Sequence, residues 1–191
     1  MARTGMTTLL SDLRGMTAAG TADYTLGTTN YWSDDQLQTV LDRRVLSVYR
    51  EELVPISSYD GGTLVYKEYR SSYGNYETTT GGTSIFEIEN AIGETIGTSA
   101  WTMDYTRGIL TFGTNTAGSA YFLTGKSYDI YMAAADVWQQ KAGQVATAVD
   151  FTTDNMSVKR GGLQKQALEM SRYYAAKGRV LKVSFERDDT T

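Results

Sequence analysis

The residue pattern of this chain changes twice along its length, and that change limits the folds open to it. From residue 54 to residue 123, apolar and polar residues alternate, and Gly, Thr and Tyr are abundant. Such alternation is typical of short antiparallel strands joined by tight turns. The flanking sequence carries more Ala, Leu and charged residues at helical spacing. We therefore expect a sheet that is inserted between two helical segments.

The flanking segments predict about four helices. Ser33 and Gln36 occupy the two positions of a capping box. The apolar residues that follow recur at helical spacing and predict a helix over 34–52. Ser127 is expected to cap the helix that follows the sheet. The other predicted helices cover 5–14, 127–149 and 162–176.

The central segment predicts five strands, and the end of the chain predicts one more. A hairpin is expected over 101–112, and a brief hairpin or loop over 150–161. The predicted strands cover 63–69, 83–89, 100–105, 108–112, 117–123 and 180–186.

These elements predict an α+β protein. Residues 1–53 and 127–178 would form a core of about four bundled helices. A small antiparallel β domain would be inserted at 54–126, and 179–191 would be an extended C-terminal tail. The strand in this tail would either fold locally as an edge strand or dock by completing the sheet of another chain.

The composition argues against an enzyme. The chain has no His and no Cys, which excludes Ser-His-Asp triads, Cys-His dyads, disulfides and ordinary zinc sites. We expect no catalytic residue, no cofactor and no metal. The net charge of −4 comes without a basic stripe, so no nucleic-acid-binding surface is expected. The sequence contains no run of about 18 apolar residues, so no membrane span is predicted. The N-terminus lacks a secretory pattern, so we expect the protein to stay in the cytoplasm.

Two motifs suggest catalytic chemistry, and each has a simpler interpretation. The sequence at 120–127, AYFLTGKS, matches a relaxed P-loop pattern. Its loop positions are Tyr, Phe and Leu, which favour a strand, so we interpret Gly125 and Ser127 as a strand-to-helix turn. Glu87 and Glu89 lie on one side of a predicted strand and could serve as an acid/base pair. A simpler interpretation is that they form the solvent-exposed face of the strand, with Phe86 on the buried face.

Several residues are candidates for contact with other chains. Tyr73 and Tyr76 lie in a loop of the β domain, and Tyr is favoured in interfaces. They could instead stack on sugars, as in a carbohydrate-binding module. Ala133, Ala134 and Trp138 are expected to pack between helices or between subunits of a ring. The two alanines are small and would let another backbone approach closely.

Three segments together resemble the head-to-tail adaptor (connector, or head-completion) proteins of tailed bacteriophages. They are 31–37 (YWSDDQL), 128–138 (YDIYMAAADVW) and 159–174, the last preceded by Asp150 and Phe151. The resemblance covers residues 30–53 and 127–178. The sheet between them departs from the smallest, all-helical members of the family.

The resemblance implies a structural virion protein, assembled in the host cytoplasm and located in the virion neck. It implies a homo-oligomeric ring, commonly dodecameric, that binds the portal, extends the DNA channel and supports a stopper or tail-completion protein. DNA would pass through the lumen without specific binding. The C-terminal segment would dock on the portal through Val180, Leu181, Val183 and Phe185. The alternatives are another neck or tail component, such as a stopper or tail-completion protein, and a carbohydrate-binding module.

Overall fold

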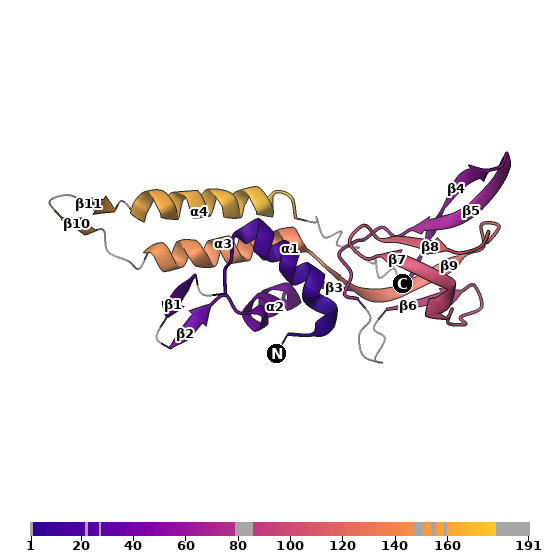
Figure 1. Cartoon of the computed structure of the whole chain (residues 1–191), viewed down its shortest axis with the longest axis horizontal. Helices are drawn as coiled ribbons and strands as arrows, with labels where there is room; N and C mark the ends of the chain where they lie inside the picture. The colour runs from indigo at the N-terminus through magenta and orange to yellow at the C-terminus, as the bar shows by residue number, and fades with distance from the viewer. Residues whose placement is uncertain are drawn as a thin grey trace, which may run out of the picture.

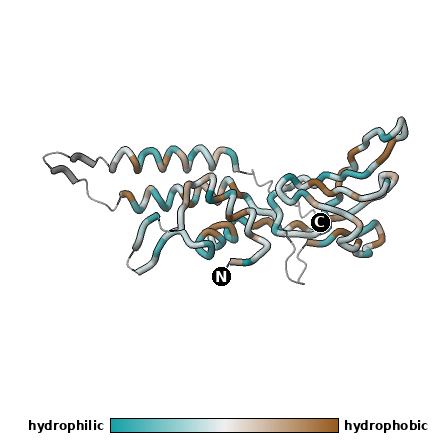
Figure 2. The backbone as a smooth tube through the Cα atoms, in the orientation of Figure 1, coloured by the Kyte–Doolittle hydropathy of each residue, from teal (hydrophilic) through white to brown (hydrophobic). Residues whose placement is uncertain are grey.

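Two separate apolar cores divide the chain into a helical half and a strand half (Figure 1). The computed structural model describes residues 2–21, 23–26, 28–78, 86–146, 151–153, 156–158 and 160–178. The two halves lie end to end, so the molecule is elongated. Hydrophobic segments run along α1, α2 and α3 in one half and along the strands in the other (Figure 2).

The helical half gathers segments from both ends of the sequence. In it, α3 and α4 lie side by side and antiparallel, with α1 and α2 against α3 (Figure 1). Its helices are η1 (Thr4–Met6), α1 (Thr7–Thr17), α2 (Asp34–Asp42), α3 (Ile130–Ala146) and α4 (Arg160–Ala175). Its two antiparallel hairpins are β1–β2 (Tyr24–Leu26, Thr29–Tyr31) and β10–β11 (Phe151–Thr153, Met156–Val158).

The strand half contains two antiparallel sheets. The first has the order β3-β9-β6 and the second the order β4-β5-β8-β7. A short helix, η2 (Thr98–Ala100), precedes β7. The strands are β3 (Val45–Glu52), β4 (Val54–Asp60), β5 (Thr63–Arg70), β6 (Glu87–Asn90), β7 (Trp101–Asp104), β8 (Ile109–Phe112) and β9 (Tyr121–Tyr128). Their shared core includes Leu53, Tyr69, Ile88, Leu110 and Leu123, each at most 1% exposed.

The predicted fold class is wrong. The chain is a mixed α/β protein with a sandwich-like arrangement of sheets, and it is not a helical bundle that carries a small inserted β domain. The strands of the two sheets begin at Val45 and end at Tyr128, so they take in sequence that was assigned to helices on both sides.

The first misassigned segment is the second half of the helix predicted over 34–52. The capping box at Ser33 and Gln36 is present, but the helix ends at Asp42 and residues 45–52 form β3. Val45 and Val48 fit helical spacing, yet both are β-branched, and they pair across β9 with Tyr128 and Gly125. Pairing with a distant strand outweighs local periodicity here.

The second misassigned segment is the strand-to-helix turn expected at Gly125 and Ser127. Strand β9 runs through both residues to Tyr128, and the Ser127 hydroxyl donates to the carbonyl of Gly74 at 2.6 Å instead of capping a helix. The cap of α3 is Asp129, whose carboxylate accepts from the amide of Met132 at 3.0 Å.

Other predicted elements are confirmed. They are the N-terminal helix (α1), the strand over 63–69 (β5), the hairpin over 101–112 (β7–β8), the hairpin at 150–161 (β10–β11) and the last helix (α4). Strand β4 is an addition that the predicted strands did not include.

Candidate interaction surfaces

Among the residues that the structure describes, helix α4 is covered on one side only. Among its side chains from Gly161 to Ala175, Ala167 is the buried one, at 5% exposure. Ser171 donates to the carbonyl of Ala135 at 3.0 Å and so holds α4 on α3. By contrast, α3 buries six side chains, because α1 and α2 cover its other side.

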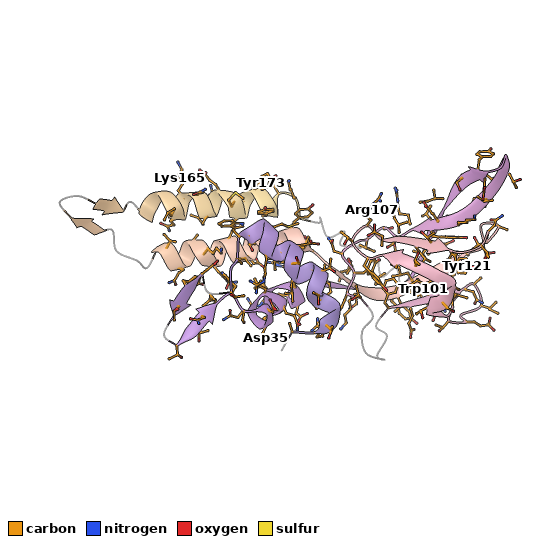
Figure 3. The ribbon with its side chains drawn as sticks, in the orientation of Figure 1. Asp35, Trp101, Arg107, Tyr121, Lys165 and Tyr173 are labelled. Carbon is orange, nitrogen blue, oxygen red and sulfur yellow. The ribbon has the colours of Figure 1, made fainter. Side chains whose placement is uncertain are left out.

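The side of α4 turned away from α3 carries both apolar and charged groups. Leu168 is 37% exposed and Tyr173 is 51% exposed. Figure 3 shows Lys165 and Tyr173 on this side of the helix. We define the α4 outer face by five exposed residues at helical spacing: Lys165, Leu168, Glu169, Arg172 and Tyr173.

A groove lies between α2 and α3, on a different side of the helical half. It consists of a hollow of about 400 Å³ and a hollow of about 170 Å³, and Arg43 and Gln140 line both. Tyr31, Trp32 and Val40 contribute to the smaller hollow. We call this surface the α2–α3 groove.

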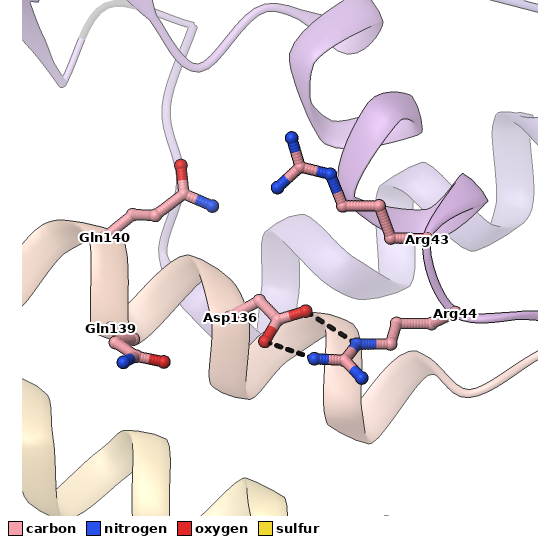
Figure 4. Close-up of a pocket in the computed structure, with 5 residues that line it drawn as sticks. All are labelled: Arg43, Arg44, Asp136, Gln139 and Gln140. Carbon is pink, nitrogen blue, oxygen red and sulfur yellow. Dashed lines mark hydrogen bonds and ion pairs between the residues drawn. The ribbon is translucent and has the colours of Figure 1, made fainter.

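Two arginines in this groove differ in their contacts. Arg44 donates two hydrogen bonds to the carboxylate of Asp136, at 2.7 and 2.8 Å, and these raise the pKa of the guanidinium (Figure 4). Arg43 is exposed, and its side chain has no ion pair or hydrogen bond within the described part of the chain. Arg44 therefore holds α2 to α3, whereas Arg43 is available to an outside group.

A second exposed surface is the hairpin of β4 and β5, which projects from the strand half (Figure 1). No side chain of β4 is buried. Val54 is 61% exposed, Tyr59 is 79% exposed and Leu64 is 42% exposed. Among the described strands, β4 pairs with β5 alone. We call residues 54–64 the β4–β5 arm, and its exposed apolar side chains suit contact with another chain.

A polar network joins the two halves. Arg3 donates to Glu77 at 2.7 Å and to Asp42 at 2.6 Å, and the Tyr128 hydroxyl donates to Glu77 at 2.7 Å. Glu77 is 3% exposed. Burial, followed by the neighbouring Glu77, raises the pKa of Tyr128 above its usual range. This network is not predictable from the sequence, because its members lie far apart in the chain.

The two loop tyrosines expected at a contact surface lie in different settings. Tyr76 is 1% exposed, which corrects its assignment as a surface contact. Its loop folds back on β9, where Tyr76 bridges to Ser127, and its hydroxyl lies 2.6 Å from that of Ser71. Tyr73 is partly buried against the strand core.

The residues proposed for packing between helices or ring subunits make their contacts within the helical half of the same chain. Ala133 and Ala134 are fully buried in the helical core, beside α1 and α2. Trp138 donates from its indole nitrogen to the carbonyl of Met16 at 3.2 Å. The portal-docking residues Val180, Leu181, Val183 and Phe185 lie outside the described residues.

The acidic pair Glu87 and Glu89 lies on β6, an edge strand of the first sheet. Phe86 and Ile88 are buried, as the strand pattern predicted, and Glu87 and Glu89 are partly exposed between them. Glu89 forms an ion pair with Arg50 at 3.4 Å. Within the described residues, no three potential metal ligands gather into a metal-binding group.

Comparison of this chain with protein-family models, with curated proteins and with solved structures finds no match. No helix in the described ranges is long and apolar enough to cross a membrane.

Proposed function

We propose that this chain is a structural subunit of a head-to-tail adaptor ring in the neck of a tailed bacteriophage. The observation that carries the proposal is the packing of the three segments that resemble this family. Residues 31–37 and 128–138 supply Trp32, Leu37 and Val137 to one core, and Tyr174 of 159–174 packs against it. Segments that are distant in sequence thus form one structural unit.

The exposed surfaces also support a role in assembly. The α4 outer face lies in the helical half and the β4–β5 arm in the strand half, and both expose large apolar side chains. A ring subunit needs contacts to copies of itself and to proteins above and below it. An elongated chain with separate surfaces in each half meets that need.

In this proposal the partners are the portal, a stopper or tail-completion protein, and further copies of the chain. The chain would work by contact and not by catalysis. The net charge of −4 suits a lumen through which DNA passes without being bound. Docking of Val180, Leu181, Val183 and Phe185 on the portal stays a prediction.

One observation favours a second candidate, a stopper or tail-completion protein. Such components depend more on sheets than on helices, and two sheets occupy most of residues 45–128. The carbohydrate-binding alternative has less support, because Tyr76 is buried and cannot form a stacking surface with Tyr73.

Co-purification with candidate neighbours separates these functions. The protein is mixed with the portal protein, and separately with the tail-tube protein, from the same genome, and each mixture is passed through a sizing column and imaged by electron microscopy. The adaptor proposal expects a complex with the portal that shows an added ring. Binding to the tail tube without the portal would favour the second candidate. If the chain binds neither the portal nor the tail tube, both candidate functions are contradicted.

A further inference from the structure

The smaller hollow of the α2–α3 groove is lined by a residue whose buried donor has no acceptor. Trp32 lines this hollow and is 1% exposed. Its indole N–H forms no hydrogen bond with any residue that the structure describes. The other two tryptophans each donate to a backbone carbonyl at 3.2 Å, Trp101 to Ile96 and Trp138 to Met16. Because a buried N–H without an acceptor costs free energy, Trp32 points to an acceptor from outside the chain.

The same hollow has a cation and no anion. Arg43 lines it, and the Arg43 side chain has no ion pair or hydrogen bond with any described residue. Among the described residues that line the two hollows, Asp136 has the only carboxylate, and both of its oxygens accept from Arg44. Figure 4 shows the Arg43 side chain extending toward Gln140, apart from that pair. A free cation together with an unpaired N–H favours a ligand that is both an acceptor and an anion.

The size and lining of the hollow fit one acidic side chain. Its volume is about 170 Å³, which is below the roughly 300–1,000 Å³ of pockets that enclose a whole small molecule. Tyr31 and Val40 offer apolar surface to the methylene groups of such a side chain. The side-chain oxygen of Gln36 already accepts from the amide of Ser33 at 2.8 Å. The adjoining hollow of about 400 Å³ leaves space for the rest of a partner segment.

We infer that the smaller hollow binds a carboxylate, which an acidic side chain of a partner protein supplies. The carboxylate would accept from the indole N–H of Trp32 and from the guanidinium of Arg43. A side chain is the source that fits an open groove on a protein that works by contact. The choice of partner rests on the proposed function, since that partner would belong to the neck.

Nuclear magnetic resonance of the isotope-labelled protein tests the chemistry of the ligand. The chain has three tryptophans, and Trp32→Phe identifies the indole signal of Trp32. Propionate, which matches the end of a Glu side chain, is added at constant ionic strength. We expect the Trp32 signal to shift and to saturate, and the other two indole signals to stay in place. Propionamide, the neutral analogue, should bind at least about tenfold more weakly, because charge-assisted hydrogen bonds are stronger.

Arg43→Gln tests the contribution of the cation and should weaken propionate binding at least about tenfold. Arg107→Gln is the matched control, because Arg107 is an exposed arginine on the strand half (Figure 3) and should leave binding unchanged. An unmoved Trp32 signal would overturn the inference. Equal binding of propionate and propionamide would also overturn it, because a neutral group or a water molecule would then be enough for the indole.

Assembly on the portal tests the source of the carboxylate. Arg43→Gln should weaken assembly at least about tenfold, and Arg107→Gln should leave it unchanged. If Arg43→Gln loses propionate binding but assembles normally, no partner supplies the carboxylate, which refutes the inference and leaves the proposed function standing. Propionate binding by a chain that does not bind the portal would support the carboxylate site and refute the adaptor function.

Discussion

The network that joins the two halves should contribute strongly to stability, and Arg3→Ala tests this. Glu77 accepts hydrogen bonds from Arg3 and from Tyr128, and it is 3% exposed. Without Arg3 the carboxylate loses its cation and keeps the Tyr128 hydroxyl as a side-chain donor. Breaking a buried ion pair costs roughly 3–5 kcal/mol. The Arg3 side chain is itself 41% exposed, so water can partly replace it. We therefore expect a loss of about 2 kcal/mol.

Urea denaturation followed by tryptophan fluorescence measures this change in the free energy of unfolding. Asp42→Asn is the matched control, because it removes the other carboxylate that Arg3 contacts, whose side chain is 37% exposed. This control should cost less than about 1 kcal/mol. The double variant Arg3→Ala with Glu77→Gln should recover part of the loss, because it buries no charge. If Arg3→Ala costs no more than Asp42→Asn, the buried carboxylate of Glu77 does not depend on Arg3.

Three further variants test other parts of the fold. Burial raises the pKa of Tyr128 above the ordinary value of 10.0, so the folded chain keeps a proton that the unfolded chain releases. Stability should fall as the pH rises above 10, and Tyr128→Phe should lessen that fall in urea titrations at several pH values. Gly108 has φ +68°, and a Cβ there would lie 1.9 Å from the carbonyl of Tyr73. Gly108→Ala should therefore lower stability by at least about 2 kcal/mol, seen as a lower urea midpoint. Ala134→Leu overfills the helical core and should cost about 1–3 kcal/mol in thermal unfolding; an unchanged Tm would contradict the packing.

Elements that are defined by residues close together in the chain could be predicted from the sequence. The start of α2 follows from Ser33 and Gln36, whose reciprocal hydrogen bonds lie within one turn of chain. The β7–β8 hairpin follows from its turn, where Gly108 has a positive φ. In both cases, residues close in sequence provide most of the interactions that define the element.

The end of α2 could not be predicted in the same way. Valines at 45 and 48 are spaced as on one face of a helix, and they form a strand because they pair with β9, about 80 residues later in the chain. Ser127 was misassigned for the same reason, because its hydrogen-bond partner Gly74 lies in a distant loop.

The candidate surfaces also differ in whether the sequence predicts them. An amphipathic α4 was predictable from its spacing, and Ala167 is buried as that pattern requires. The α2–α3 groove was not predictable, because Arg43 and Gln140 come together only when the two helices pack. The same holds for Glu77, which has no local sign that it is buried beside Arg3.

Electron microscopy of the isolated neck complex tests the adaptor role most directly. The account predicts a ring directly below the portal, in which each subunit fits this elongated chain. A neck map in which every subunit below the portal is accounted for by other proteins would contradict it.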